Sequence, residues 1–366
     1  MSFFFNSWSI AWLGQTAFAL RACPGRWWAR LRWWWCFPGE TVGGLAAGTG
    51  HAVILAVYHY HIHFSRLGTN QIADPFFMAL ALLFLYRALD KNSHFDWTMV
   101  GVVCALALYF YAGARLTAVV ILAVLGYEFI RQPRRFFRER GRGLLVALGA
   151  FLLVGAPIIQ YALRFPQDFN ARLNQVGILQ NGWLQKAMVV EGTGPVPVLW
   201  EQFIRAALAF NFYPDRTIWY GLREPLLKPV WGVLFLVGLG YAMLRLVGRG
   251  ANPRYAPLVI WWWAGMLLGG FLTENPPSSQ RLVTLAVPVT FFLALALWQI
   301  IRLLLGLFAG KSYSRSLANG LLAVGVLLFA LSSFKTYFAE YTPLRIYGGP
   351  NSEMATTIAP GCVSCA

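Results

Sequence analysis

The sequence HYHIHFSRLGTNQIADP, residues 59–75, separates two long apolar segments in the first quarter of the chain. It contains three histidines, one arginine, two amides and one aspartate, although only 12% of the chain is charged and 58% is hydrophobic. Polar side chains beside apolar spans are costly unless they face water, a partner or a ligand. We therefore expect this stretch to form one wall of a functional site and its apolar flanks to decide the fold.

The bulk composition indicates a membrane protein. The chain has 366 residues and a mean hydropathy of +0.55, whereas about a quarter of the residues in ordinary soluble domains are charged. Several apolar runs reach the roughly 20 residues that cross a bilayer as a helix. An outer-membrane barrel would need alternating strands of about ten residues, which the sequence does not show. We predict an all-α, polytopic transmembrane helical bundle.

The apolar runs predict about eight or nine crossings. The predicted spans are residues 43–62, 75–89, 97–111, 116–130, 143–163, 226–247, 256–273, 282–305 and 317–334. An atypical segment rich in tryptophan and arginine, residues 1–42, precedes this transmembrane domain of residues 43–334, and residues 335–366 form a predicted tail. The loop 165–225 is too long for a simple connector, and its amphipathic stretches predict short helices on the membrane surface.

The net charge of +16 predicts how the chain crosses the membrane. The loop 131–142 contains six arginines, and basic loops stay on the cytoplasmic side. Alternation of the spans then places the remaining polar clusters on the extracytoplasmic face: residues 59–75, 111–115, 165–225, 273–281 and the tail. No aromatic and basic nucleic-acid module is recognisable. We therefore attribute the charge to orientation and to contact with anionic lipid.

Asp74 is the first candidate for chemistry. A carboxylate at the head of a membrane span is expensive to bury and is a functional candidate for that reason. Because Asp74 comes directly before Pro75, it could also cap the helix by accepting free amides of the first turn. The two roles are compatible.

The same stretch offers further ligands. The Arg66 guanidinium could grip a phosphate or pyrophosphate, or it could extend to lipid headgroups. His59 and His63 would share a helical face, and His63 could bind a divalent metal together with Asp74. His61 and His63 could equally line the wet mouth of a cavity.

Two more predicted outer turns contain arginines. Arg115 follows the short turn YFYAGAR, and Glu274 and Arg281 flank the two prolines of TENPPSSQR. Arg281 opens a helix, whose first turn favours anions. With Arg66, three arginines thus lie on one predicted face, which indicates an anionic ligand there.

Other motifs carry less information. Cys104 lies in an apolar segment and is typical of a small core residue. Cys362 and Cys365 form a CxxC pair, which is a weak metal or redox signal without a second pair. The chain has no Walker A, GxGxxG, GxSxG or HExxH motif, so a cytosolic nucleotide-driven enzyme is disfavoured.

Three segments in order resemble the GT-C class of integral-membrane glycosyltransferases. They are HFSRLGTNQIADP before a span, YFYAGARL at the next outer turn and ENPPSSQRL before a late span. The chain is similar to bacterial proteins of glycosyltransferase family 39, the protein O-mannosyltransferase and aminoarabinose-transferase-like group, over about residues 50–350. The likeness is a pattern of several loops and not one diagnostic motif.

This resemblance implies a transferase of the bacterial plasma membrane that acts in the cell envelope. Its donor would be a polyprenyl-phosphate sugar, transferred with inversion on the extracytoplasmic face to a glycan, lipid or protein, often with a divalent metal such as Mg²⁺ or Mn²⁺. Asp74 matches an acidic active-site residue of the second outer loop. Arg66, Arg115 or Arg281 would hold the phosphate, and His61, His63 and Glu274 are further candidates for substrate binding.

One departure from the family pattern affects this interpretation. The family carries an acidic residue or pair in its first outer loop, and this sequence has no acidic residue before Glu40. We therefore expect a truncated or frame-shifted N-terminus as one explanation. A catalytically impaired relative or a membrane scaffold is the alternative function, and a transporter is a third, although no internal repeat or midplane charge favours it.

Overall fold

The computed structural model describes residues 44–67, 69–217, 219–247, 251–308 and 315–344. The predicted N-terminal segment 1–42, Glu40, the CxxC pair and residues 345–366 lie outside the described residues.

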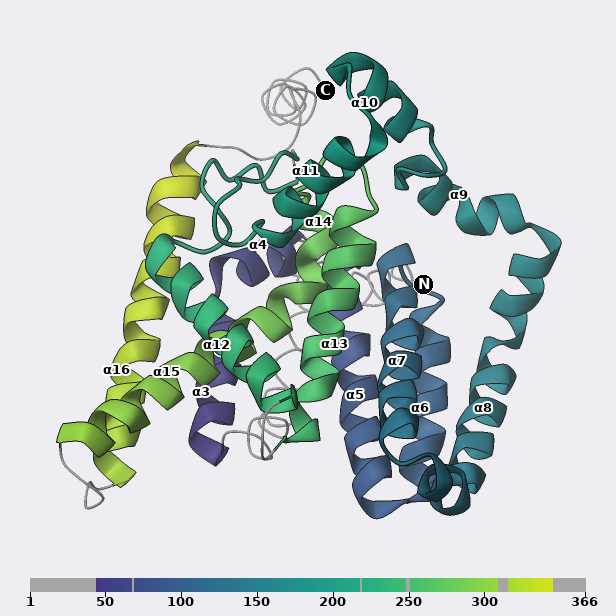
Figure 1. The fold of residues 1–366 in the computed structure, drawn as a ribbon, viewed down its shortest axis with the longest axis horizontal. Helices are drawn as coiled ribbons and strands as arrows, with labels where there is room; N and C mark the ends of the chain where they lie inside the picture. Colours follow the sequence, from purple (N-terminus) through teal and green to yellow (C-terminus); the bar gives the residue numbers. More distant parts are fainter. Residues whose placement is uncertain (1–43, 68, 218, 248–250, 309–314, 345–366) are drawn as a thin grey trace, which may run out of the picture.

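The described residues confirm the predicted all-helical fold, with no β-strand and one isolated bridge between Gly177 and Thr273 (Figure 1). The first half contains α3 (Gly44–Val57), α4 (His59–Leu67), η1 (Asn70–Ile72), α5 (Ala73–Lys91), α6 (His94–Ala107), η2 (Ala112–Arg115), α7 (Leu116–Arg131), α8 (Pro133–Arg164), α9 (Pro166–Val176) and α10 (Trp183–Glu191). The second half contains α11 (Pro195–Ala207), α12 (Pro229–Val247), η3 (Pro253–Tyr255), α13 (Ala256–Gly265), η4 (Met266–Phe271), α14 (Ser279–Leu282), η5 (Val283–Leu285), α15 (Ala286–Phe308), α16 (Arg315–Phe334), η7 (Lys335–Tyr341) and η8 (Thr342–Leu344).

Six helical stretches are long and apolar enough to cross a membrane. They are Asn70–Lys91, Ala112–Arg131, Phe136–Arg164, Pro229–Val247, Ser279–Phe308 and Arg315–Leu344, and Ala47–Val57 and His94–Ala107 are shorter apolar helices. Each of them falls on a predicted span, because a continuous apolar run of this length has few alternatives to a membrane helix.

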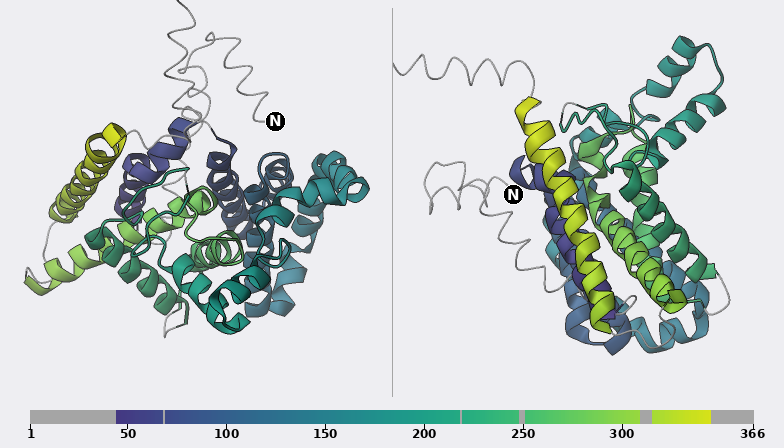
Figure 2. Two further views of the ribbon diagram at one scale, coloured as in Figure 1. Left: turned by 90° about the horizontal axis from the view of Figure 1, so that it is seen from above. Right: turned by 90° about the vertical axis from the view of Figure 1, so that its left-hand side faces the viewer.

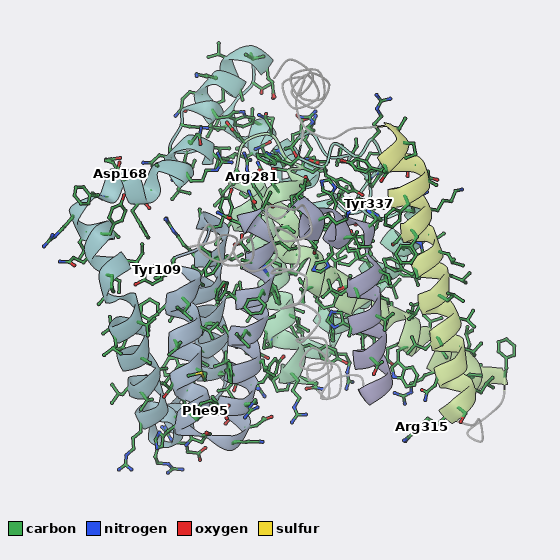
Figure 3. The ribbon with its side chains drawn as sticks, turned by 180° about the vertical axis from the view of Figure 1, so that it is seen from behind. Phe95, Tyr109, Asp168, Arg281, Arg315 and Tyr337 are labelled. Carbon is green, nitrogen blue, oxygen red and sulfur yellow. The ribbon has the colours of Figure 1, made fainter. Side chains whose placement is uncertain are left out.

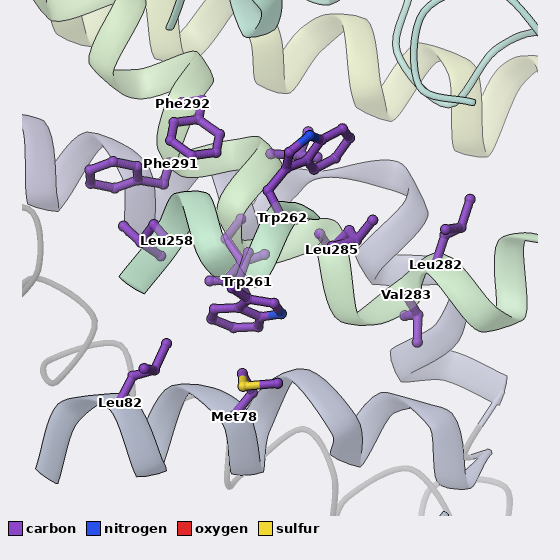
Figure 4. Close-up of a cluster of buried hydrophobic side chains, with 14 of the residues drawn as sticks. Met78, Leu82, Leu258, Trp261, Trp262, Leu282, Val283, Leu285, Phe291 and Phe292 are labelled. Carbon is purple, nitrogen blue, oxygen red and sulfur yellow. The ribbon is translucent and has the colours of Figure 1, made fainter. Parts of the chain in front are cut away.

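A shared aromatic core joins the helices of the first half of the chain to those of the second. Figure 4 shows Trp261 of α13 pointing toward Met78 and Leu82 of α5, while Trp262 lies toward Leu285. Trp261 is fully buried, and its indole nitrogen donates to the Thr284 hydroxyl at 3.2 Å. Because an indole N–H needs an acceptor when it is buried, this bond fixes α13 against η5.

Two boundaries differ from the sequence prediction. The basic segment 131–142 is not a loop, because α7 ends at Arg131 and α8 begins at Pro133, with Gln132 as the break between them. Proline suits the first position of a helix, and arginine is a good helix former. At the other end of the chain, the predicted tail from Lys335 starts as the π-helix η7, which continues α16.

The predicted short helices of the loop 165–225 are present as α9, α10 and α11. In the side view of Figure 2 the teal α10–α11 hairpin projects from one end of the bundle. Figure 3 shows Arg281, Tyr337 and Asp168 toward this end, while Phe95 and Arg315 lie at the opposite end. We call the first of these the polar end of the bundle. It is where the predicted outer segments gather.

Candidate functional site

Asp74 lies in the first turn of α5, where its side chain is buried with 4% of its surface exposed. The predicted capping role is wrong, because Ile72 occupies the N-cap position and no side chain caps the helix. The 3₁₀ turn η1 runs directly into α5, so the chain itself supplies the acceptors for the first amides. The Oδ1 atom of Asp74 has no hydrogen-bond partner in the described part of the chain.

Gly113 makes room for this carboxylate. A Cβ atom added to Gly113 in η2 would lie 2.1 Å from Oδ2 of Asp74, a distance at which one of the two groups must move. The turn YAGAR therefore contacts Asp74 directly. The sequence predicts this short turn, but it does not indicate that the missing side chain of Gly113 makes space for Asp74.

Several other buried polar atoms near this point also lack partners among the described residues. They are Thr69 Oγ1, Gln71 Oε1, Thr117 Oγ1, Ser278 Oγ and Gln280 Oε1. The segments that carry them are neighbours, because α5 packs on α7 and η5, and η5 packs on η1 and α14. Buried polar groups are nearly always hydrogen-bonded in folded proteins. A concentration of unpartnered ones at one place is typical of a ligand site.

Arg281 is held by Glu274 within the turn 273–281. Its guanidinium donates to the Glu274 carbonyl oxygen at 2.6 Å and lies 3.7 Å from the Glu274 carboxylate. Asn181 donates to the same carboxylate at 3.0 Å. Because a guanidinium has five N–H donors, Arg281 keeps donors for a further acceptor. Figure 3 shows it at the polar end of the bundle.

Arg115 is directed toward α9. One of its terminal nitrogens donates to the carbonyl oxygen of Phe169 at 2.7 Å, and the guanidinium lies 3.6 Å from the centre of the Phe169 ring. The contact joins the η2 turn, which contains Gly113, to α9. Its Nε atom is buried and has no partner among the described residues.

The histidines of α4 face an aromatic cluster. His63 donates from Nε2 to the carbonyl oxygen of Trp219 at 2.7 Å and stacks on Tyr220 at 4.3 Å between ring centres. His59 Nδ1 lies 2.8 Å from the Tyr220 hydroxyl. Burial lowers the pKa of His59 to about 3 and that of His63 to about 4, so both are neutral at pH 7. His61 is also buried.

Arg66 lies apart from these contacts. It is exposed, and its guanidinium lies 5.4 Å from the ring centre of Tyr337 and 5.7 Å from that of Phe338. Both rings belong to η7, which continues the last span. Arg66 therefore borders the last candidate span.

The metal site predicted from Asp74 and His63 stays a prediction. Within the ranges that the structure describes, no group of three or more histidine, cysteine, aspartate or glutamate side chains could hold a metal ion. His63 also uses Nε2 for the Trp219 carbonyl. The donor set near Asp74 thus consists of one carboxylate with neutral amide and hydroxyl groups, and a divalent ion there would take its other ligands from water and substrate phosphate.

Sequence reasoning missed Asp215, which lies between α11 and α12. Its carboxylate accepts hydrogen bonds from Thr217, Gly221 and Ser279. The pair Asp215–Thr217 is typical of a turn in which aspartate bonds the backbone two residues ahead. That signal would have predicted a turn, but not a contact with the distant residue 279.

The comparisons agree with the sequence resemblance. Residues 40–160, which include Asp74, Gly113 and Arg115, match the family model of dolichyl-phosphate-mannose-protein mannosyltransferases. A comparison with curated protein sequences found no match.

Solved structures share the fold. The oligosaccharyltransferase of Archaeoglobus fulgidus in its apo form has a TM-score of 0.52 at 13% identity, covering 93% of this chain and 46% of that one. The same enzyme tethered with an acceptor peptide containing the NVT sequon gives 0.55 at 15% identity, covering 97% and 48%. The archaeal oligosaccharyltransferase AglB with an inhibitory peptide and a dolichol-phosphate gives 0.53 at 14% identity, again covering 97% and 48%. This chain therefore spans about half the length of these proteins. The resemblance to the GT-C class is confirmed.

Proposed function

We propose that this chain is a membrane glycosyltransferase that moves a sugar from a polyprenyl-phosphate donor to an acceptor. Transfer takes place at the polar end of the bundle, on the extracytoplasmic face, and inverts the anomeric carbon. The family match and the shared fold support the enzyme class. The observation that carries the proposal is the buried carboxylate of Asp74, which has no hydrogen-bond partner among the described residues.

Asp74 accepts the proton in this proposal. A hydroxyl of the acceptor attacks the anomeric carbon of the donor sugar while the bond from that carbon to the phosphate oxygen breaks. The hydroxyl proton passes to the Asp74 carboxylate, which acts as general base. The lipid phosphate leaves with the electron pair of the broken bond. A buried carboxylate whose Oδ1 atom has no hydrogen-bond donor among the described residues suits this role, because that oxygen is free to accept a proton.

Arg115 and Arg281 are proposed to bind the donor phosphate. Each uses part of its guanidinium for a protein carbonyl, at Phe169 and Glu274, and keeps other N–H donors. Donors fixed in advance stabilise the negative charge that develops on the leaving phosphate. Arg66, at the border with the last span, is placed for the phosphate of a donor whose lipid stays in the bilayer.

The unpartnered amides and hydroxyls around Asp74 fit a ligand rich in hydroxyl groups. Gln71 and Gln280 present buried oxygens, and Ser278 and Thr117 present buried hydroxyls. A sugar would satisfy such groups, whereas an apolar substrate would leave them unbonded at a cost of about 1–3 kcal/mol each.

The test is a transfer assay in detergent or nanodiscs with a panel of radiolabelled polyprenyl-phosphate sugars, run with and without divalent metal. The chain is compared with Asp74→Asn and with Asp96→Asn, a buried aspartate at the other end of the α5–α6 pair. We expect the unmodified chain and Asp96→Asn to release polyprenyl phosphate, and we expect Asp74→Asn not to release it. Full turnover by folded Asp74→Asn would refute the role of Asp74. No turnover with any donor would favour an impaired relative or a scaffold.

A further inference from the structure

Asp215 joins two separate segments of the polar end. It lies in the irregular stretch between α11 and α12, and its Oδ1 atom accepts the backbone N–H of Ser279 at 3.1 Å. The same carboxylate accepts the N–H of Thr217 at 3.1 Å, its hydroxyl at 2.8 Å and the N–H of Gly221 at 3.1 Å. Hydrogen bonds to an ionised acceptor are stronger than neutral ones, so this is a firm connection across 64 residues of sequence.

The connection replaces a local cap. Ser278 is the N-cap residue of α14, and its side chain makes no capping bond. The amide of Ser279, at the first position of the helix, is therefore bonded by Asp215 from a distant loop. A free amide at a helix start normally needs a side chain or water as acceptor. Asp215 thus determines how the stretch α14–η5–α15 begins.

Arg281 follows Ser279 by two residues and lies in the same turn of α14. The neighbouring contacts hold this turn from other sides, because Arg216 donates from its backbone to the Pro277 carbonyl and the Tyr60 hydroxyl donates to the Ser279 carbonyl. Glu274 binds the Arg281 guanidinium itself. The direction of Arg281 is thus set at its backbone by Asp215 and at its tip by Glu274.

We propose that Asp215 is a positioning residue that fixes the first turn of α14 and thereby directs Arg281 at the donor phosphate. The part that concerns the phosphate rests on the function proposed above. Asp215 does not act as the proton acceptor, because both of its oxygens already accept hydrogen bonds from the protein. Asp74, whose Oδ1 has no such donor in the described residues, keeps that role.

The first test is hydrogen–deuterium exchange on the full chain in nanodiscs. In Asp215→Ala we expect faster exchange in residues 213–221 and 277–282, with the other spans unchanged. Thr217→Val keeps the Asp215 carboxylate and removes the Thr217 hydroxyl, which contacts both Asp215 oxygens and the Ser279 hydroxyl. It is a milder variant in case the first does not fold. Asp168→Ala, an exposed carboxylate of α9, is the matched control. Unchanged exchange in both segments of the Asp215 variant overturns the proposal, whether or not the chain transfers sugar.

The second test separates positioning from general stability. Asp215→Ala and Thr217→Val should raise the KM for the donor, and a misplaced charge can cost on the order of a hundredfold in kcat/KM. In an Arg281→Gln background the same substitutions should have little further effect, because coupled residues are not additive. Fully additive losses would overturn the link to Arg281. If the unmodified chain transfers no sugar, the proposed function fails, and the exchange experiment alone decides the role of Asp215.

Discussion

Asp74 and Asp96 are both buried aspartates in the first turn of a helix, and they lie at opposite ends of the α5–α6 pair. Asp96, at the start of α6, is 1% exposed, and its Oδ1 atom lies 2.9 Å from Nε of Arg87. Asp74, at the start of α5, is 4% exposed and has no such partner among the described residues. Figure 3 shows Phe95, the neighbour of Asp96, far from the polar end. Burial alone therefore does not distinguish the proposed catalytic carboxylate from Asp96, whereas the absence of an ion-pair partner among the described residues does.

The contrast has a simple physical basis. A buried charge is stable only when it is paired or hydrogen-bonded, and Asp96 meets this condition through Arg87 on the preceding helix. The protein keeps Asp74 without a partner and even places Gly113 against it so that it fits. Residues that lower the stability of the folded protein are typical of active sites.

The largest expected effect comes from Asp74→Asn. Because an amide cannot accept the acceptor's proton as a carboxylate does, transfer should fall by about 10²–10⁴-fold, the usual contribution of a general base. Thermal stability in detergent should stay the same or rise, since the variant replaces a buried carboxyl group whose Oδ1 atom has no partner among the described residues. A variant that is both inactive and clearly less stable would indicate a structural role and remove the contrast with Asp96.

Asp96→Asn should show the reverse pattern. Arg87 would lose its carboxylate, and we expect the free energy of unfolding to fall by about 1–3 kcal/mol. Activity per folded molecule should be kept. The double variant Arg87→Gln/Asp96→Asn should recover part of the stability, because a neutral pair replaces an unpaired charge. Melting curves of the two single variants and the double variant measure this, and an unchanged melting temperature in Asp96→Asn would show that the pair contributes nothing.

Gly113→Ala tests the contact between η2 and the Asp74 carboxylate. The new methyl group would lie 2.1 Å from Asp74 Oδ2, so Asp74 or η2 must shift, at a cost of about 1–3 kcal/mol. Transfer should fall together with stability. Gly126→Ala in α7 is the matched control, because a Cβ there meets no atom within 4 Å, and alanine should stabilise that helix slightly. Equal behaviour of the two variants in both assays would contradict the proposed contact.

These residues also show what the sequence could predict. The helical bundle follows from uninterrupted apolar runs, whose length leaves few other folds. Asp74, Arg115 and Arg281 stood out because charge beside such runs is rare. The partners could not be predicted, because the Arg87–Asp96 pair, the Gly113 contact and the Asp215 bond depend on how turns meet in space. The predicted capping role of Asp74 was wrong for the same reason, because the turn η1 runs into α5 and supplies the acceptors for its first amides.

The last expected effect concerns acid sensitivity at the polar end. The folded pKa of His63, about 4, and that of His59, about 3, lie below the unfolded value of 6.5. The unfolded chain therefore binds more protons as the pH falls, and the stability that each neutral histidine contributes is complete above pH 6.5. It is lost progressively below this value, by about 1.4 kcal/mol per pH unit for each histidine, until the folded pKa is reached.

His63→Gln tests this expectation, because glutamine can keep a donor for the Trp219 carbonyl and does not titrate between pH 4 and 7. Its melting temperature should fall less steeply from pH 7 to pH 5 than that of the unmodified chain. His94→Gln, at an exposed position at the start of α6, is the matched control and should retain the full acid dependence. If the melting temperatures of His63→Gln and the unmodified chain fall equally with pH, protonation of His63 does not cause the loss of stability in acid. The polar end would then be no more sensitive to acid than the opposite end.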